Sequence, residues 1–278
     1  MTDKILITGA GGQLGTSLTK LLPEAILTDK NELDITNEND VNSFVKNNNI
    51  NIIINCAAYT NVDKAEEETD LAEQINTVGA KNLAETGRKI IHVSTDYVFD
   101  GQNNIPYKTE DKPSPISIYG KTKLAGEKEV LKNPQSVVIR TAWLYSSYGK
   151  NFVKTMLKLG SEKEQITVVN DQIGTPTYAR DLAKAIVDIL PQINTKTSGI
   201  YHFTNEGVCS WYDFATEIMH MANKKCKVLP ISSSEYPTKA TRPNYSLLDK
   251  SKIKNTFNIN IRHWRQALVD CLKELENE

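Results

Sequence analysis

Short apolar runs separated by helix-like stretches are the feature that most constrains the fold of this chain. Runs that are apolar at successive positions suit parallel strands, because helices cover both faces of such a sheet. The alternation therefore predicts an α/β fold with a doubly wound, Rossmann-type parallel sheet. The runs lie in the first half of the 278-residue chain, at 5–7, 25–27, 52–54, 90–93 and 137–139.

The helix-like stretches divide the chain into a regular first half and a looser second half. Helices are expected at about 14–22, 37–47, 70–87 and 117–131, and further along at 150–160, 179–190, 210–223 and 262–276. The alternation weakens after about Ala142. We expect a dinucleotide-binding domain over 1–148 and about 166–204. A smaller C-terminal substrate-binding lobe is expected over about 149–165 and 205–278.

Charge and composition exclude several classes of function. The formal net charge is −1, with Lys and Arg scattered along the chain, so neither nucleic acid nor an anionic membrane is an expected partner. No apolar run approaches the roughly 18–20 residues of a membrane span, and no secretory signal precedes the first run. The Cys and His residues are dispersed, so we expect reduced thiols, no metal site and a cytoplasmic protein.

A glycine turn joins the first predicted strand to the first predicted helix. Gly9, Gly12 and Gly15 follow the run 5–7, and the expected helix begins at about Leu14, directly after Gln13. Glycines in this position let backbone N–H groups approach a pyrophosphate, which the positive end of the helix attracts. The spacing is G-x-x-G-x-x-G, yet the strand-before and helix-after context indicates a dinucleotide-binding turn.

Two further strand ends carry residues suited to the same cofactor. Asp29 follows the second run, at the position where a carboxylate accepts from the adenosine ribose of NAD. The adjacent Lys30 would suit the 2′-phosphate of NADP. The choice between NADH and NADPH stays open. Ala57 and Ala58, after the third run, are small enough for a flat ligand to lie against the backbone.

The residues for carbonyl chemistry follow the fourth run. Thr95 and Asp96 come just after that run. Tyr119 and Lys123 are four residues apart, so they share one face of a helix. Reduction of a ketone needs a proton on oxygen, which Tyr119 could supply. Moving its pKa from about 10 to about 7 takes about 4 kcal/mol of phenolate stabilisation, and the ammonium of Lys123 is the expected source. Thr95 would orient the substrate oxygen.

These residues belong to a longer pattern of motifs that covers nearly the whole chain. The pattern resembles the extended short-chain dehydrogenase/reductases and, more narrowly, the dTDP-4-dehydrorhamnose reductase family. The stretches that carry the resemblance are 9–15, 33–35, 55–59, 62–66, 94–101, 119–127, 140–143, 171–177, 209–212, 235–238 and 242–243.

The resemblance implies a role for individual residues. The catalytic set would be Thr95, Tyr119 and Lys123, with hydride passing from NADPH or NADH to C4 of a dTDP-4-keto sugar. Asp96, Trp143 and Arg242 would join Thr95 in binding the sugar nucleotide. The dinucleotide would lie along the residues of the glycine turn and two later stretches: Gly9, Gly12, Gln13, Leu14, Gly15, Asp29, Asp34, Ile35, Ala57, Ala58 and Tyr59, together with Tyr119 and Lys123.

The resemblance also implies a homodimer bridged by Mg²⁺ bound to glutamates. One of these glutamates would lie on the first helix, where this chain has Ser17. We therefore expect neither the Mg²⁺ site nor that mode of dimerisation in this chain, while a homodimer of another kind stays open.

Alternative functions use the same scaffold. A 4,6-dehydratase would need a second carboxylate after Asp96, where this chain has Tyr97, so dehydration is disfavoured. Another nucleotide-sugar 4-ketoreductase or an epimerase stays open. A non-catalytic, dinucleotide-binding regulatory subunit, such as the partner of a methionine adenosyltransferase, is the alternative outside enzymes. The complete set of Thr95, Tyr119 and Lys123 favours an enzyme.

Overall fold

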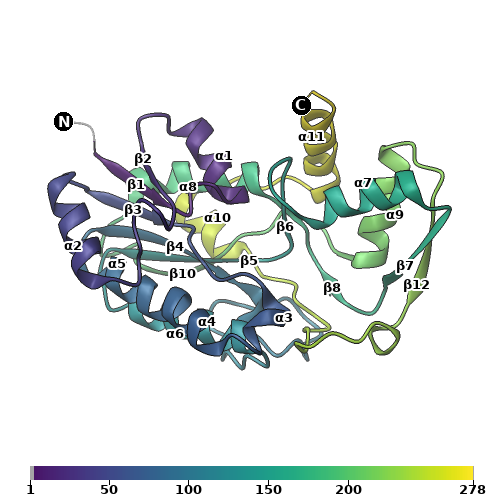
Figure 1. Cartoon of the computed structure of the whole chain (residues 1–278), viewed down its shortest axis with the longest axis horizontal. Coiled ribbons are helices and arrows are strands. Elements are labelled where there is room, and N and C mark those ends of the chain that lie inside the picture. Colours follow the sequence, from purple (N-terminus) through teal and green to yellow (C-terminus); the bar gives the residue numbers. More distant parts are fainter. Residues whose placement is uncertain (1–2, 278) are drawn as a thin grey trace.

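A six-stranded parallel sheet forms the centre of the molecule, in a computed structural model that describes residues 3–277 (Figure 1). The strand order is β2-β1-β3-β4-β5-β10, and every neighbouring pair is parallel. The predicted Rossmann-type α/β fold is therefore confirmed. The strands are β1 (Ile5–Thr8), β2 (Ile26–Thr28), β3 (Ile52–Asn55), β4 (Lys89–Thr95), β5 (Ser136–Thr141) and β10 (Gly199–His202).

Successive apolar residues of each strand enter two different hydrophobic clusters. Leu6 and Ile53 pack with α2 (Glu38–Asn47), α5 (Ala80–Glu85) and α6 (Ile118–Val130). Ile7 and Ile54 pack on the opposite face with α1 (Gln13–Leu21), α8 (Ala179–Ile189) and α10 (Ser251–Phe257). Because side chains alternate between the faces of a strand, an uninterrupted apolar run is buried only when both faces are covered. Figure 1 shows the two helical layers above and below the sheet.

The predicted helix 70–87 contains an irregular turn. It consists of α4 (Thr69–Glu73), a π-helical turn η1 (Gln74–Gly79) and α5. The buried Asn76 in this turn accepts a hydrogen bond from the Tyr59 backbone N–H at 2.9 Å and donates to Thr122 Oγ1 at 3.1 Å. A π turn re-aims one side chain within a helix, and here it ties the helix to α6 and to the loop after β3.

A smaller group of elements has its own hydrophobic cluster around Phe214 and Trp264 (right side of Figure 1). It contains β7 (Gln165–Val169), which pairs in parallel with β12 (Lys227–Ile231). The division into two domains stays a proposal. Ile166 and Val168 of β7 pack in the cluster of the smaller lobe, which favours moving 166–169 from the dinucleotide-binding domain to that lobe. The helices of this group are α7 (Phe152–Glu162), α9 (Trp211–Met221) and α11 (Trp264–Glu276).

Several elements were not expected from the sequence. Strand β10 completes the sheet although it begins at Gly199 and contains Tyr and His, so it lacks the apolar run of the other strands. Strands β7 and β12 and helix α10 were not expected either. The other unexpected elements are too short for a periodic pattern. They are α3 (Val62–Ala65), β6 (Leu144–Tyr145), β8 (Ile173–Gly174), β9 (Thr177–Tyr178), β11 (Cys209–Ser210), η2 (Asp96–Val98), η3 (Leu190–Gln192) and η4 (Ser233–Glu235).

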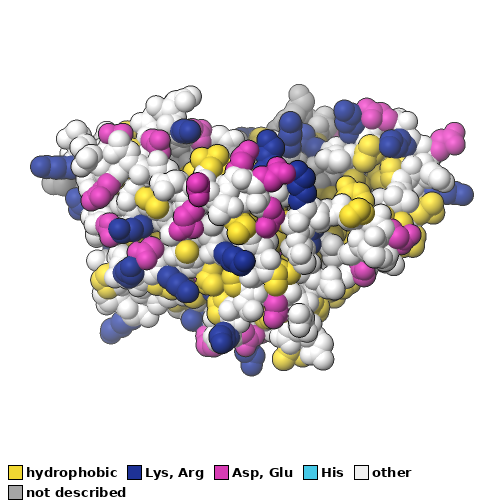
Figure 2. All heavy atoms as spheres, turned by 60° about the horizontal axis from the view of Figure 1, so that its bottom comes forward, with side chains coloured by type: hydrophobic (Ala, Val, Ile, Leu, Met, Phe, Trp, Pro, Cys, Tyr) yellow, Lys and Arg dark blue, Asp and Glu magenta, His cyan; other side chains and the backbone are white. Residues whose placement is uncertain are grey.

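The surface carries charges of both signs. Figure 2 shows Lys and Arg side chains interspersed with Asp and Glu over the face turned toward the viewer. Within residues 3–277, none of the helices has the length and apolar character that crossing a membrane requires.

Candidate active site

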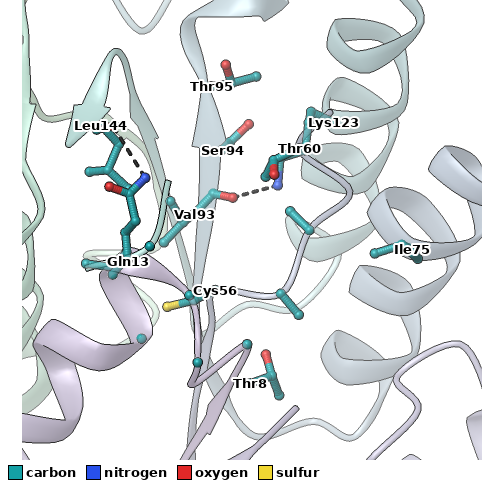
Figure 3. A pocket seen from close by; sticks show the side chains of 18 of the residues that line it. Thr8, Gln13, Cys56, Thr60, Ile75, Val93, Ser94, Thr95, Lys123 and Leu144 are labelled. Atoms are coloured by element: carbon teal, nitrogen blue, oxygen red, sulfur yellow. Dashed lines mark hydrogen bonds between the residues drawn. The ribbon is translucent and has the colours of Figure 1, made fainter. Parts of the chain in front are cut away.

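A cleft of about 930 Å³ lies at the carboxyl ends of the central strands (Figure 3). Ligands of doubly wound sheets bind at this edge. Its walls come from the ends of β1, β2, β4 and β5 and from the loop after β3. Most residues predicted for the site line it: Gly9, Gly12, Gln13, Leu14, Gly15, Asp29, Asp34, Ile35, Ala57, Ala58, Thr95, Asp96, Tyr119, Lys123 and Trp143.

Two glycines of the turn, Gly9 and Gly15, have no room for a side chain. Gly9 has φ of +68°, and a Cβ on it would lie 2.7 Å from the backbone N of Ala57. A Cβ on Gly15 would lie 2.2 Å from the backbone O of Gly9. The turn therefore exposes backbone N–H groups at the N-terminus of α1 without side chains in front of them. This arrangement fits the pyrophosphate of a dinucleotide.

Two carboxylates that were predicted to bind the dinucleotide line the cleft. Asp29 accepts a hydrogen bond from the Gly11 N–H at 2.9 Å, at the end of β2. Asp34 accepts from Thr36 Oγ1 at 2.7 Å and from the Thr36 N–H at 3.0 Å, and these bonds lower its pKa. Lys30 lines the cleft as well. Groups suited to NAD and to NADP are thus both present.

Gln13 connects the glycine turn with the chain that leads to the smaller lobe. Its Nε2 donates to the backbone O of Leu144 at 3.5 Å (dashed in Figure 3), and its Oε1 accepts from Ser146 Oγ at 3.0 Å. One side chain therefore contacts both walls of the cleft.

Thr95 and Asp96 form a buried pair at the end of β4. Thr95 Oγ1 donates to Asp96 Oδ1 at 3.0 Å and accepts from the Tyr97 N–H at 3.1 Å. Burial raises the pKa of Asp96 from 3.8 to about 6, although the hydrogen bond from Thr95 opposes this shift. A fraction of the Asp96 carboxyl groups therefore carries a proton near neutral pH.

Tyr119 keeps its proton in this structure, in contrast to the expectation from the sequence. Burial raises its pKa to about 12, the negative charge of Asp96 acts in the same direction, and a hydrogen bond with Thr95 opposes both. The expectation that Lys123 lowers the pKa of Tyr119 is therefore wrong for this structure. The Lys123 ammonium donates to the backbone O of Val93 and not to the Tyr119 hydroxyl.

Lys123 is fully buried and bound to the backbone of β4. Its Nζ donates to the backbone O of Val93 at 2.7 Å, across the gap between α6 and β4 (dashed in Figure 3), and its exposed fraction is 1%. Burial lowers the pKa of Lys123 to about 8, while the charge of Glu127 acts against that shift. The side chain can thus gain or lose a proton near neutral pH.

An ion pair beneath the cleft was missed by the sequence analysis. Glu127 Oε1 and Oε2 accept from Arg140 Nε at 2.9 Å and from Nη2 at 2.7 Å, and Oε1 also accepts from Ser94 Oγ. Both side chains are buried, so the two charges compensate each other. The spacing of four residues from Lys123 to Glu127 was the available signal, because it continues the face of α6 that holds Tyr119.

Trp143 has an unusual backbone and a stacked side chain. Its φ is +50°, in the left-handed region that non-glycine residues rarely adopt. The ring stacks on Trp211 with centroids 3.7 Å apart and an interplanar angle of 12°. Backbone strain of this kind persists where the surroundings fix a residue, often at functional sites. The pair forms an aromatic wall between the cleft and the smaller lobe.

Tyr59 and Arg242 lie outside the cleft lining. The Tyr59 hydroxyl donates to Glu68 Oε2, which raises the pKa of Tyr59 to about 12. Arg242 Nη2 donates to Asp63 Oδ2 at 2.9 Å, on α3. The predicted roles of both residues in ligand binding stay predictions.

The residues present do not form an evident Mg²⁺ site. Ser17 is buried, and its hydroxyl donates to the backbone O of Gln13 at 2.9 Å. Over the part of the chain that the structure describes, no group of three or more His, Cys, Asp or Glu residues is gathered closely enough to hold a metal ion.

Comparison with known proteins identifies close relatives. Residues 3–277 match a family described as the RmlD substrate binding domain. A dTDP-4-dehydrorhamnose reductase of Aggregatibacter actinomycetemcomitans is 45% identical, over 95% of this chain and 97% of the relative. The solved structure of such a reductase from Clostridium acetobutylicum has a TM-score of 0.94 and 45% identity, covering 98% and 99% of the two chains. A third, from Bacillus anthracis in complex with NADP, has a TM-score of 0.93 and 43% identity, covering 99% and 100%.

Proposed function

Since this chain belongs to the dTDP-4-dehydrorhamnose reductase family, we propose that it reduces the C4 ketone of dTDP-4-dehydro-L-rhamnose to dTDP-L-rhamnose. NADPH or NADH is the proposed reductant. The observation that carries the proposal is one cleft lined by both the glycine turn and the set Thr95, Tyr119 and Lys123. A dinucleotide and a sugar nucleotide could meet in a space of about 930 Å³.

The glycine turn and the loop after β3 would hold the dinucleotide. Gly9 and Gly15 keep the pyrophosphate region free of side chains, and Ala57 and Ala58 provide a flat wall. When bound, the reduced nicotinamide supplies the hydride. Asp29 would accept from the adenosine ribose of NADH, and Lys30 would favour the additional phosphate of NADPH.

Tyr119 would donate the proton to the C4 oxygen. Its raised pKa keeps the hydroxyl protonated at neutral pH, which a proton donor requires. Lys123 would bind the nicotinamide ribose. It would stabilise the remaining phenolate if its Nζ turned from the Val93 carbonyl toward Tyr119. Thr95 would orient the substrate oxygen beside Tyr119.

The sugar nucleotide would lie between the end of β4 and the smaller lobe. Asp96 can accept hydrogen bonds from sugar hydroxyls, and the ring of Trp143 offers an apolar face to the sugar. Arg242 would bind the sugar nucleotide only if the loop that carries it moved, because its guanidinium donates to Asp63 in this structure.

The direct test is the oxidation of NADPH and NADH with enzymatically prepared dTDP-4-dehydro-L-rhamnose. We expect rapid loss of the reduced-nicotinamide absorbance and dTDP-L-rhamnose as the product, and the two rates rank the cofactors. A folded protein that binds dinucleotide without oxidising it would contradict the proposal. Turnover only with a different 4-keto sugar nucleotide would indicate another ketoreductase of the same family.

A further inference from the structure

Three buried side chains connect strand β1 with Lys123. Thr8 Oγ1 donates to Asn55 Oδ1 at 2.8 Å, Asn55 Nδ2 lies 3.0 Å from His92 Nδ1, and His92 Nε2 lies 3.4 Å from Lys123 Nζ. Each of the three is only 1% exposed. Thr8 pairs with Asn55 across β1 and β3, and Asn55 pairs with His92 across β3 and β4, so the sheet register fixes their order.

The hydrogen bonds of Asn55 determine which way its amide points. The backbone N–H of Ala57 donates to the same Oδ1 at 3.1 Å. A backbone N–H can only donate, so the atom facing it must be the oxygen and the atom facing His92 must be the NH₂ group. Asn55 therefore donates to His92 Nδ1.

That bond determines where the proton of His92 lies. Nδ1 accepts, so a neutral ring carries its single proton on Nε2. The ring is neutral, because burial and the charge of Lys123 lower the pKa of His92 well below 6.5. The Nε2–H group is consequently on the side of the ring that faces Lys123 Nζ.

We propose that His92, held in its Nε2–H form by Asn55, is a positioning residue for Lys123 that makes it easier for the lysine to give up its proton. An ammonium opposite an N–H group is a donor facing a donor. A neutral amine in the same place accepts a hydrogen bond from Nε2–H and still donates to the Val93 carbonyl. The tautomer thus favours the amine relative to the ammonium.

Other charged or titratable groups act on Lys123 from the elements around it. Glu127, one turn further along α6, and Cys56, from the loop after β3, favour the ammonium, whereas burial opposes it. Glu127 is itself paired with Arg140. Asn55 bonds neither Glu127 nor Arg140, although it precedes Cys56 and accepts from the Ala57 N–H. An acidic residue at position 55 also adds a charge near Lys123, so the ring tautomer of His92 is measured in the same variant.

The first test uses the wild-type protein with isotope-labelled histidine, without substrate. Nuclear magnetic resonance of the ring nitrogens distinguishes the two tautomers. We expect His92 to be neutral with its proton on Nε2 between about pH 6 and about pH 9. His202 is an internal reference, because its Nδ1 lies 3.1 Å from the carbonyl oxygen of Tyr107 and must donate to it, which gives the opposite tautomer. A proton on Nδ1 of His92, or a charged ring, would overturn the proposal.

The second test compares Asn55→Asp with Thr8→Val. A carboxylate at position 55 accepts from Nδ1–H, which leaves a lone pair on Nε2 for the Lys123 ammonium. The midpoint of the Lys123 titration, followed on its labelled ε-carbon, should rise by about one pH unit or more. Thr8→Val removes one hydrogen bond to Oδ1 but leaves Nδ2 facing His92, so we expect the tautomer and the midpoint of the wild type.

The outcomes separate this inference from the proposed function. An unchanged Lys123 midpoint in Asn55→Asp would contradict the role of His92. If that variant does not fold, the wild-type tautomer decides alone. The effect on turnover rests on the proposed function: the alkaline limb of kcat/KM should move upward with the Lys123 midpoint. Both resonance measurements need no turnover, so they stand even if the sugar is not reduced.

Discussion

Tyr119 and Lys123 lie one helical turn apart on α6, and burial moves their pKa values in opposite directions. The pKa of Tyr119 rises to about 12 and that of Lys123 falls to about 8. Burial favours the neutral form of each group, so the tyrosine retains its proton and the lysine releases one more easily. Tyr119 is thus protonated and able to donate, and the neighbouring Lys123 can bind or release a proton near neutral pH.

Tyr119→Phe tests the proton donor at the scale of one oxygen atom. We expect turnover to fall by about 10²–10⁴-fold, with dinucleotide binding retained, as measured by steady-state kinetics and by fluorescence titration with NADPH. Tyr201→Phe is the matched control, since its hydroxyl bonds the Thr197 carbonyl and its side chain does not line the cleft. Wild-type turnover in Tyr119→Phe would exclude the role.

Asp96→Asn tests the burial of a carboxyl group. The folded pKa of about 6 exceeds the value of 3.8 for an exposed carboxyl. As pH rises between these values the unfolded state loses its proton first, so the contribution of Asp96 to stability falls and stays low above about pH 6. The variant should raise the free energy of unfolding at pH 7 by up to about 3 kcal/mol. Urea unfolding at about pH 4 should show no such gain; an equal gain at both pH values would contradict the assignment.

Helix α6 is central to the site because β4, β5 and the π turn η1 fix its position. Tyr119, Lys123 and Glu127 face β4 and β5 from one side of the helix. The π turn η1 contacts another side, where a Cβ on Gly126 would lie 2.1 Å from the backbone O of Asn76. The close approach of two backbones thus sets the distance between α6 and the cleft.

Gly126→Ala should therefore displace α6. We expect a loss of about 1–3 kcal/mol in the free energy of unfolding from overpacking, together with reduced turnover. Gly160→Ala on α7 is the matched control. Its Cβ would lie 2.6 Å from the flexible Met219 Sδ, and the change should stay within about 1 kcal/mol. Equal stability of the two variants in urea unfolding would show that the backbone contact does not limit packing.

For the whole molecule, buried tyrosines and cysteines determine the response to alkaline pH. Burial raises the pKa of Cys56 from 9.0 to about 12, and it raises that of Tyr97, Tyr145, Tyr178 and Cys209 as well. Between the unfolded and folded values the folded state binds more protons, so stability falls as pH rises. Lys123 acts in the opposite direction between about 8 and 10.5, and so does Lys250, whose pKa burial also lowers, but the tyrosines and cysteines outnumber these two lysines.

We therefore expect the free energy of unfolding to decline above about pH 9, measured by urea unfolding under reducing conditions. Tyr145→Phe should reduce the decline. Among the described residues its buried hydroxyl has no hydrogen-bond partner, so the variant should be no less stable at neutral pH. A free energy that is constant or rises with pH would contradict this prediction.

The smaller lobe gives the cleft its second wall. The stacked rings of Trp143 and Trp211 come from opposite sides of the boundary between the sheet and this lobe. Gln13 bonds the chain that leads into the lobe. Contacts of this kind couple the position of the lobe to the glycine turn.

Local sequence patterns were enough to predict the sheet and most residues that line the cleft. The apolar runs at 5–7, 52–54 and 137–139 require cover on both faces, and the glycines after the first run indicated a dinucleotide-binding turn. Tyr119 and Lys123 share a helix face because four residues make about one turn. Each of these conclusions depends on a few neighbouring residues, which is why a local pattern was sufficient.

The ion pairs and the protonation states of the buried groups became apparent only in the folded structure. Glu127 and Arg140 are thirteen residues apart along the chain and form a buried pair, and Asn55 reaches His92 only because β3 and β4 are in register. The raised pKa of Tyr119 likewise follows from burial and from the nearby Asp96. Solvation and electrostatic energies depend on distances in space and on access to water, so they are set only when the chain is folded.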